Sequence, residues 1–581
     1  MPTSSAVALI AIALVAMSSL VIGLFGVRFA RNTSDFLQAS RTTPAAVNAS
    51  AISGEYLSAA SFLGVAGLIL KDGPDALWYP VGFTAGYLAL LLFVAAPYRR
   101  SGAYTVSDFV DFRLRSPMLS RVCATITVVI GWLYLLPQLQ GAGLTFATVV
   151  PMWPSSIGVV VAAAVVVLSV VIGAHKSITF VQAFQFWLKF TALAVPAIAL
   201  MLYIGSDHRP LNRPAPPQFL IETTVTVETD ANLEVTQPVS FMSNGVVDGQ
   251  PRIGPTRWSV GLHTVDKGTT LVFPAGTSVP VPVGYPVRDS TWLTPLSGDA
   301  EHQMFAIYSL IIATFLGTMG LPHLLVRFYT NTDGRAARRT AVMVLGLLGA
   351  FYLLPEVLGV ISRLYVPQLL VGGDSDAAVL LLPAAVLGNG WFGTSLTALV
   401  TAGAWAAFLS TSSGLVMSVS GVLSSNATLF PRSWLLDIRI AAVLAGAVPL
   451  ALALTASRLD FSQTVSLAFA VAASTFCPLM FLGIWWAGLT DRGAIAGLVV
   501  GGVTSVTAVV LSLFDVAPGD GWTGLLLARP AAVTVPAAFL TMVVVSKLTA
   551  GRLLPDVSRL MLRLHAPERL GLNQERAGRS G

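Results

Sequence analysis

Apolar segments follow one another along most of this chain, and each is roughly 20 residues long, which is the length of an α-helix that crosses a bilayer. Of the 581 residues, 55% are hydrophobic and 11% are charged, whereas a soluble domain carries about 25% charged residues. Because lipid offers no partners to backbone polar groups, segments of this kind are expected to be helical. We therefore predict an all-α integral membrane protein with about 13 transmembrane helices, over residues 4–27, 47–70, 76–97, 120–149, 155–173, 177–204, 303–327, 337–361, 391–424, 438–457, 463–489, 493–514 and 529–548.

Basic residues are distributed unevenly between the loops. If the N-terminus lies outside, most cations, such as Arg99 and Arg100, fall on the cytoplasmic side together with the basic C-terminal tail, as the positive-inside rule requires. The net charge of +6 then reflects topology and implies no nucleic-acid partner. We expect a multi-pass protein of the plasma membrane, in contact with the lipid bilayer, with its C-terminus in the cytoplasm. The sequence leaves the oligomeric state open.

Residues 207–302 depart from the membrane pattern. β-Branched and polar residues alternate from Ile221 to Glu228, and turn-forming pairs occur at Asn244-Gly245 and Asp248-Gly249. Such alternation between turns predicts short strands and hairpins. We expect a small β-rich extracellular insertion, and the alternative is a disordered one because large aliphatic residues are few. A second external stretch, 364–390, contains an apolar run too short to span and predicts a re-entrant or interfacial helix.

The stretch from Asn48 to Gly67 is long enough to cross a bilayer but is unusually polar and rich in glycine. A membrane helix can unwind only where its freed backbone groups are enclosed by protein, and such breaks occur at transporter binding sites. Glu55 supports this interpretation, because an ionisable residue inside the membrane is costly and is usually functional. The alternative is a small-residue packing helix with Glu55 near the cytoplasmic interface.

A second informative run, from Thr401 to Gly421, is a spanning segment rich in hydroxyls. Na⁺ is a hard cation that prefers oxygen ligands, and hydroxyls and unwound carbonyls supply them. Ser410 and Thr411, with the carbonyl of Ala407, could face carbonyls freed at Gly54 and Leu57. The alternative is that these hydroxyls only bond back to their own helix or to a neighbouring one.

Three motifs, in this order, resemble signatures of the sodium:solute symporter family. They are the run from Glu55 to Gly64, the loop from Arg99 to Leu114, and the Gly-Leu-Pro-His run from Gly320 to Phe328. The first and third are most similar to the acetate and monocarboxylate branch. The resemblance covers nearly the whole membrane part. It implies a leucine-transporter-like 5+5 inverted-repeat core with extra helices at both ends, and secondary transport driven by a sodium gradient.

This resemblance gives each part of the chain a role. Residues 1–46 form the first transmembrane helix and a cytoplasmic linker, 47–206 the first half of the transporter core, and 207–302 the insertion. Residues 303–457 form the second half of the core, 458–548 the additional helices, and 549–581 the cytoplasmic tail.

The resemblance also implies which residues bind the coupling ion. The family's sodium site would fall on Gly54, Leu57 and Ala407 through their carbonyls, and on Ser410 and Thr411 through their hydroxyls. Na⁺ is therefore the expected cofactor. Acetate permeases tend to have small apolar residues in place of Ser410-Thr411 and Asp in place of Glu55. The hydroxyl pair instead resembles the proline and sugar branches, which favours sodium coupling and weakens acetate as the substrate.

Substrate ligands are expected around the two broken helices. Half-helix N-termini offer free N–H groups to a carboxylate. The candidates are Glu55, Tyr56, Ser58, Ser61, Gln138, Gln140, Thr314, Gly317 and Thr318.

Three charged or titratable residues have other expected roles. Lys189 lies halfway along its helix and is either an anion partner or, as we favour, a side chain that snorkels to an interface. His323 and Arg327, near a cytoplasmic helix end, are expected to act in gating or capping.

The residue patterns favour transport over other classes of function. No nucleophile elbow, phosphate loop or metal cluster is found in the sequence, so we do not expect an enzyme. We expect a symporter that couples inward Na⁺ movement to uptake of a small organic solute, such as a short monocarboxylate. The alternatives are an H⁺-coupled monocarboxylate transporter and a non-transporting membrane sensor on a transporter fold.

Overall fold

The structure is a computed structural model that describes residues 3–27, 44–103, 105–172, 175–205, 216–296, 302–328, 334–426, 434–456, 460–514 and 521–566. The predicted linker at 28–43, the start of the insertion at 206–215 and the end of the basic tail at 567–581 lie outside the described residues. Within these ranges, 12 helical stretches are long and apolar enough to cross a membrane. The expected all-α membrane architecture is therefore confirmed.

The first half of the bundle begins with a helix outside the core, α1 (Thr3–Val27). The next crossing is interrupted and consists of α3 (Ala45–Tyr56), a π-helical turn at Ala60–Gly64 and α4 (Val65–Asp72). It is followed by α5 (Trp78–Leu90), a second π-helical turn at Leu91–Ala95 and α6 (Ala96–Ser101). The half is completed by α8 (Pro117–Val149), α9 (Ser155–Ile172) and α10 (His175–Ile204).

The chain reverses between α4 and α5, although helical residues continue with little interruption from Ala60 to Ser101. Gly73 has a φ of 62°, which residues with a Cβ rarely adopt, and a 3₁₀ turn follows at Gly73–Leu77. The Tyr56 hydroxyl donates to the Phe83 carbonyl at 2.8 Å. In one straight helix these residues would be about 40 Å apart. The segment is therefore two crossings, as the predictions for 47–70 and 76–97 require.

The second half follows the same plan, with a break in its first helix. It consists of α12 (Gln303–Gly320) and α13 (Pro322–Phe328), separated at Leu321, then α14 (Gly334–Tyr365), α17 (Trp391–Asn426) and α18 (Trp434–Thr455). The next crossing is also interrupted, at Thr475, between α19 (Phe461–Ser474) and α20 (Phe476–Trp485). The additional helices are α21 (Asp491–Leu513) and α23 (Ala531–Leu548).

Short helices connect or cover the long ones. In α7 (Val106–Leu114), the Thr105 hydroxyl accepts from the Asp108 N–H and the Asp108 carboxylate accepts from the Thr105 N–H, which is a capping box. The predicted re-entrant stretch contains α15 (Gln368–Gly372) and α16 (Ala378–Leu387). The others are α11 (Asp289–Trp292), α22 (Gly521–Ala528) and α24 (Val557–His565).

The insertion folds as an antiparallel sheet of seven strands, which confirms the β-rich prediction. The strands are β1 (Thr223–Thr226), β2 (Ala231–Val235), β3 (Val239–Val247), β4 (Gln250–Trp258), β5 (Gly261–Val265), β6 (Thr270–Phe273) and β7 (Val281–Pro282), in the order β1-β6-β3-β5-β2-β7 with β4 paired to β3.

One of the two predicted turns in the insertion is wrong. Strand β3 continues through Asn244-Gly245, where Asn244 pairs with Ile253. The chain turns instead at Asp248 (φ 51°) and Gly249 (φ 69°). Two consecutive residues with positive φ form the turn that joins twisted antiparallel strands.

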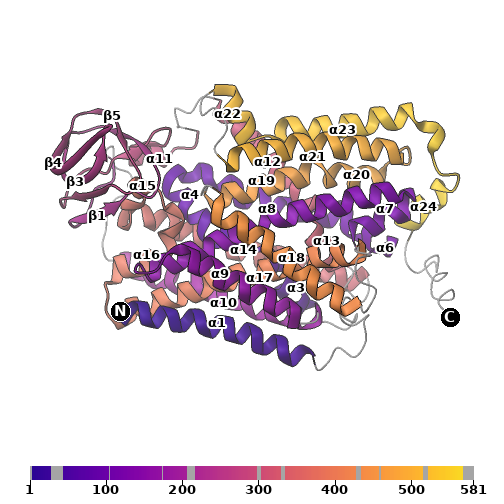
Figure 1. Cartoon of the computed structure of the whole chain (residues 1–581), viewed down its shortest axis with the longest axis horizontal. Coiled ribbons are helices and arrows are strands. Elements are labelled where there is room, and N and C mark those ends of the chain that lie inside the picture. The colour runs from indigo at the N-terminus through magenta and orange to yellow at the C-terminus, as the bar shows by residue number, and fades with distance from the viewer. Residues whose placement is uncertain are drawn as a thin grey trace.

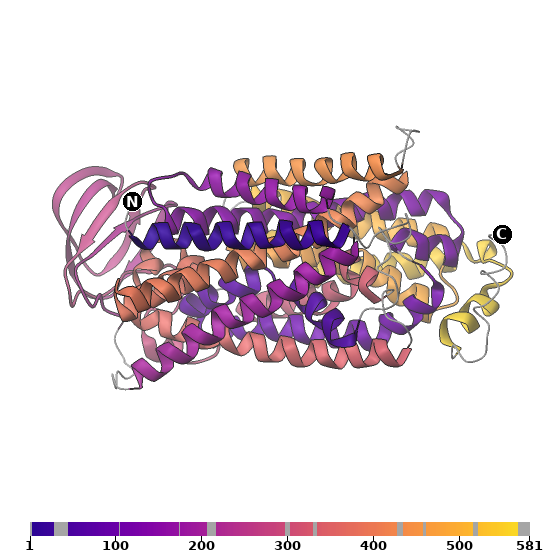
Figure 2. The same ribbon diagram turned by 90° about the horizontal axis from the view of Figure 1, so that it is seen from below.

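The long helices lie roughly parallel, with the sheet at one end of the bundle and α24 at the other (Figures 1 and 2). The start of α1 lies at the sheet end. Arg100 donates to the carbonyl of Leu564 at 3.0 Å, so a cation of the predicted cytoplasmic loop lies beside the C-terminal segment. Trp292, at the end of α11, donates to the carbonyl of Ile69 at 2.8 Å. This bond links the end of the insertion to α4.

Candidate functional site

The break after Tyr56 is the centre of the site. Leu57 has extended backbone angles (φ −77°, ψ 97°), so regular helical hydrogen bonding stops there. The Gln138 side chain on α8 accepts from the Ala59 N–H at 2.9 Å and satisfies one backbone group at the break. A Cβ at Gly54 would overlap the carbonyl of Gln182, so glycine permits the close approach of α3 to α10.

The freed carbonyls surround the ammonium group of Lys189, which is 0% exposed. Its Nζ lies 2.6 Å from both the Gly54 and the Leu57 carbonyl oxygens and 2.9 Å from the Ser410 hydroxyl oxygen. A protonated lysine has three N–H donors, and these three oxygens accept them. The expectation that Lys189 snorkels to an interface is therefore wrong, whereas a role as partner of an anionic substrate stays a prediction.

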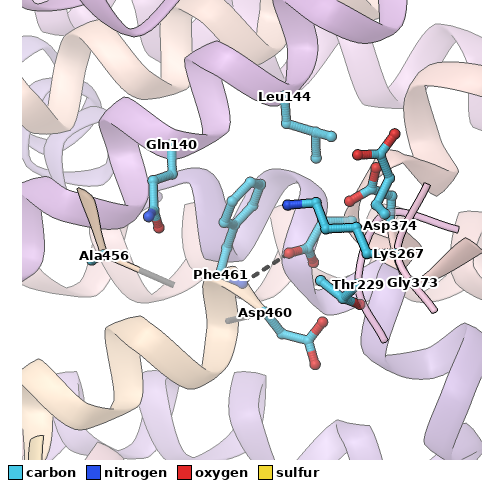
Figure 3. A pocket seen from close by; sticks show the side chains of 11 residues that line it. Gln140, Leu144, Thr229, Lys267, Gly373, Asp374, Ala456, Asp460 and Phe461 are labelled. Carbon is cyan, nitrogen blue, oxygen red and sulfur yellow. Dashed lines mark hydrogen bonds between the residues drawn. The ribbon is translucent and has the colours of Figure 1, made fainter. Parts of the chain in front are cut away.

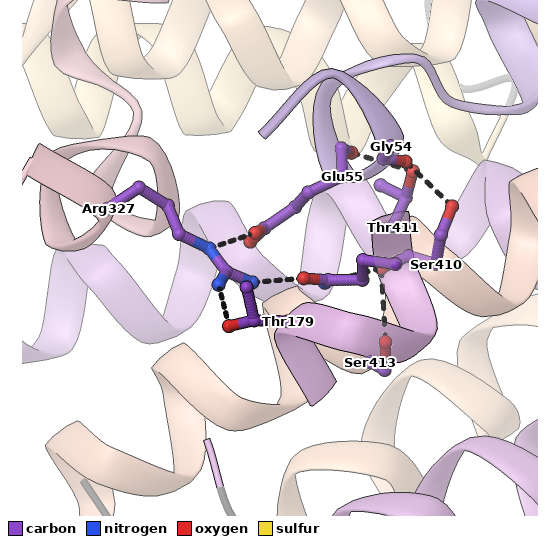
Figure 4. A network of polar contacts seen from close by, with 8 residues as sticks. Gly54, Glu55, Thr179, Arg327, Ser410, Thr411 and Ser413 are labelled. Atoms are coloured by element: carbon purple, nitrogen blue, oxygen red, sulfur yellow. Dashed lines mark hydrogen bonds and ion pairs between the residues drawn. The ribbon is translucent and has the colours of Figure 1, made fainter. Parts of the chain in front are cut away.

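Three of the five residues predicted to bind sodium contact this nitrogen, and Ala407 and Thr411 lie beside them. The Ser410 hydroxyl is 2.7 Å from the Gly54 carbonyl oxygen and 3.1 Å from that of Ala407. The Thr411 hydroxyl donates to the Glu55 carbonyl at 2.8 Å. Figure 4 shows these contacts between the broken helix and α17. We call the oxygens of Gly54, Leu57, Ala407, Ser410 and Thr411 the oxygen cage.

The oxygens of the cage suit a hard cation, but Lys189 already occupies the position that a sodium ion would take. Oxygen ligands of this kind fit Na⁺, yet the lysine nitrogen already contacts the Gly54, Leu57 and Ser410 oxygens. A sodium ion at the same place would overlap the ammonium group, and the two positive charges would repel each other. The residues present therefore fit an ammonium group, and they do not fit Na⁺ while Lys189 is charged and in place.

Next to the cage, a buried ion pair joins α3 to α13. The Arg327 Nε lies 2.6 Å from Glu55 Oε2, and the two side chains are 3% and 2% exposed. Arg327 also donates to the Thr179 hydroxyl at 3.0 Å and to the Gln182 side chain, as Figure 4 shows. Glu55, predicted among the substrate ligands, lies against Arg327 and not in the hydroxyl cluster beside Tyr56.

The two predicted gating residues lie together on the side of the break away from the sheet. His323 and Arg327 line a small cavity of about 20 Å³ together with Glu55 and Gly414. The His323 ring lies 5.5 Å from that of Tyr134. We call the contacts of Arg327 with Glu55, Thr179 and Gln182 the inner latch.

Several of the predicted substrate residues contact one another or neighbouring side chains near the break. The Tyr56 hydroxyl lies 3.1 Å from the Thr318 hydroxyl, and the Ser61 hydroxyl lies 2.9 Å from that of Tyr352. Thr314 bonds back to Leu310, and a Cβ at Gly317 would overlap the carbonyl of Phe469. Ser58 is buried at the break.

Aromatic rings surround these hydroxyls. Phe83 stacks on Tyr352 and lies 5.0 Å from Phe469, while Tyr134 contacts Phe469 edge-on. The rings and hydroxyls together form a compact, largely apolar cluster.

A larger cavity of about 380 Å³ opens at the sheet end (Figure 3). Gln140, predicted with Gln138, lines it, and both its amide atoms lack a hydrogen-bond partner in the described structure. Asp376 and Asp460 line it as well, and Asp460 pairs with Lys71 at 2.8 Å. This cavity at the sheet end is therefore much larger than the one beside the Glu55–Arg327 pair.

Several functional candidates were not predicted from the sequence. They are Lys189 in the cage, Gln182 and Thr179 in the inner latch, and the rings of Phe83 and Tyr352. The one available signal was Lys189 itself, because a charge in the middle of an apolar segment usually marks a functional site. Glutamine, threonine and ring positions carried no comparable signal.

Known proteins similar to this chain are transporters. The chain is 27% identical over 535 residues to the uncharacterised symporter YwcA of Bacillus subtilis, with 90% of each chain covered. It is 28% identical over 531 residues to the monocarboxylic acid transporter of Corynebacterium glutamicum, covering 87% of this chain and 85% of that one.

Its fold is similar to that of a Na⁺-coupled sialic acid symporter in a substrate-bound, outward-open state. The TM-score is 0.59 at 12% identity, covering 93% of this chain and 97% of the other. This likeness confirms the leucine-transporter-like architecture. The model of the sodium:solute symporter family matches residues 36–249 and 264–501, which is most of the chain, and the chain therefore belongs to the sodium:solute symporter family.

Proposed function

We propose that the protein is a secondary active symporter that carries a short monocarboxylate into the cell together with a coupling cation. The oxygen cage is the observation that carries the proposal. Carbonyls of Gly54 and Leu57, freed by a helix break, hold a cationic group against a hydroxyl of the neighbouring helix. Transporters place their coupling and substrate sites at breaks of this kind.

The substrate site we propose is the hydroxyl and aromatic cluster across the break. Tyr56, Ser61 and Thr318 supply hydrogen-bonding groups, and the surrounding rings supply an apolar surface for a short alkyl chain. The name of the Corynebacterium relative supports a monocarboxylate. We retain Ser58, Gln138, Thr314 and Gly317 as the surrounding residues, with Gln138 acting through the backbone at the break.

The unequal ends of the bundle suggest how access alternates. We place the sheet end outside and the α24 end in the cytoplasm of a plasma-membrane protein. The cavity of about 380 Å³ at the sheet end would admit the solute, while the buried pair of Glu55 and Arg327 closes the other end. His323 and Arg327 then act as gating residues, because this pair must separate for release.

Two coupling cations are candidates. Family membership supports sodium, and the sodium ligands would be the oxygens of the cage. The position of Lys189 specifically favours the second candidate, a proton, because a lysine can carry and release one. A non-transporting sensor would show neither form of coupling.

Uptake into proteoliposomes tests the proposal. Radiolabelled acetate, propionate and pyruvate would be offered with an imposed sodium gradient, an imposed proton gradient, or neither. We expect accumulation of at least one acid under one gradient and none without a gradient. Failure of all three acids under both gradients would refute monocarboxylate symport and favour the sensor.

A further inference from the structure

We propose that the ammonium group of Lys189 takes the place of Na⁺ in the oxygen cage, so that the residues present do not bind sodium there. The inference deepens the proposed function and rests on it for the transport cycle. The occupancy of the cage, however, can be tested without any substrate.

The contacts of Lys189 are those of a cation ligand site and not those of an ordinary ion pair. All three acceptors are neutral oxygens, from Gly54, Leu57 and Ser410. The other buried lysine with described contacts, Lys71, instead pairs with the carboxylate of Asp460 at 2.8 and 3.0 Å. Lys189 therefore meets the kind of neutral oxygen ligands that a hard cation prefers.

The helices packed against α10 contain few charges that could serve as an alternative partner for Lys189. Helix α10 packs against α1, α3, α14, α16 and α17, and α1, α16 and α17 contain no charged residue. The carboxylate of Glu55, the charged group of α3, is engaged by Arg327 at 2.6 Å. The titratable and charged side chains of α3 and α14 with described surroundings are Glu55, Tyr56, Arg338, Arg339, Tyr352, Glu356, Arg363 and Tyr365.

The protonated lysine holds three helices together. It links α10 to the two carbonyls that flank the break in α3 and to Ser410 on α17.

The cage is joined directly to the inner latch. The Gln182 side chain donates to the Ser410 carbonyl at 3.0 Å and accepts from Arg327. The hydroxyls of Ser410 and Thr411 contact the carbonyls of Gly54 and Glu55. These last two residues are adjacent in the chain. The occupied cage is therefore linked through Gln182 to the contacts of Arg327 in the inner latch.

Equilibrium binding of radioactive sodium to the purified full-length protein in detergent tests the proposal. We expect no saturable binding by the wild type at neutral pH. Lys189→Ala should bind sodium in the vacated cage, and Lys189→Ala/Ser410→Ala should bind it about tenfold more weakly because one ligand is lost. Lys71→Met is the matched control for loss of a buried lysine and should not gain binding.

Saturable sodium binding by the wild type that Ser410→Ala weakens would overturn the proposal. A folded Lys189→Ala protein that binds no sodium would overturn it as well, and so would a gain of binding by Lys71→Met. If Lys189→Ala does not fold, Lys189→Met and the wild-type measurement decide the question. Failure of every acid in the uptake assay would refute the proposed function and leave these binding results unaffected.

Discussion

Replacing Arg327 with Met should open the end of the bundle that faces α24. Arg327 and Glu55 form an ion pair of 2.6 Å with side chains 3% and 2% exposed. Removal of one partner of a buried pair leaves the other charge without compensation and costs about 3–5 kcal/mol. The same substitution removes the donors to Thr179 and Gln182.

This cost is specific to the closed arrangement, because in an opened one water can solvate Glu55. Each 1.4 kcal/mol is about a tenfold change in an equilibrium, so the loss would shift the population by about a hundredfold or more toward the open arrangement. Ser418 lines the small cavity beside the pair. A cysteine placed there should therefore become accessible to a maleimide from the α24 side.

The assay compares the rate of maleimide labelling of Ser418→Cys with and without Arg327→Met. The two natural cysteines, Cys123 and Cys477, are buried and should give little background. Arg363→Met is the matched control, because Arg363 pairs with Asp289 at 3.2 Å and is equally buried but lies at the sheet end. It should lower stability without raising labelling at Ser418→Cys.

Two results would refute this reasoning. One is a loss of stability in Arg327→Met with no gain in labelling, and the other is an equal gain in Arg363→Met. A further check is Glu55→Gln combined with Arg327→Met, which removes the buried charge and should recover much of the lost stability. Gly414→Ala should act in the same direction as Arg327→Met, because the added Cβ would overlap the Glu55 carboxylate.

Other substitutions test the surrounding contacts. Ser410→Ala should cost about 1–3 kcal/mol in thermal unfolding, because it leaves buried polar groups unpaired, whereas Ser420→Ala, which removes only a bond to its own helix, should cost less. Gln138→Leu should cost a similar amount, about 1–3 kcal/mol, by leaving the Ala59 N–H at the break without its acceptor, and it should slow uptake. Burial, with Asp460 beside it, raises the pKa of Asp376 well above its usual range, so the folded form binds the proton more tightly than the unfolded form. Wild-type stability should therefore fall as the pH rises from about 4, and Asp376→Asn should flatten that dependence in melting curves recorded across the range.

Much of the architecture could be predicted because membrane helices depend on length and hydrophobicity, which are local properties. The break near Leu57 was also predictable, since Gly54, Glu55 and Ser58 are poor residues for an ordinary buried helix. The break at Thr475 was not predicted, although Pro478 cannot donate to residue 474 and clashes with its carbonyl. The same residue type lies inside α8 at Pro137 without ending the helix, so proline alone did not distinguish the two cases.

The site was predictable only in part, because its chemistry depends on how helices face one another. The oxygen ligands could be named since the break and the hydroxyl-rich helix carry their own local signals. The position of Lys189 along α10 was clear, but the rotation of that helix relative to α3 was not. A lysine in the middle of a membrane helix usually reaches an interface. Here two carbonyls without helical partners accept its hydrogen bonds instead.

The contacts of Lys189 give the oxygen cage a positive charge without an ion from solution. The cage requires such a charge, because carbonyls freed from a helix and buried together are costly when unpaired. A bound ion can supply that charge from solution, and a covalently attached ammonium group supplies it from within the chain. A single residue on α10 would therefore decide between these two sources of charge without any change to the helices that form the cage.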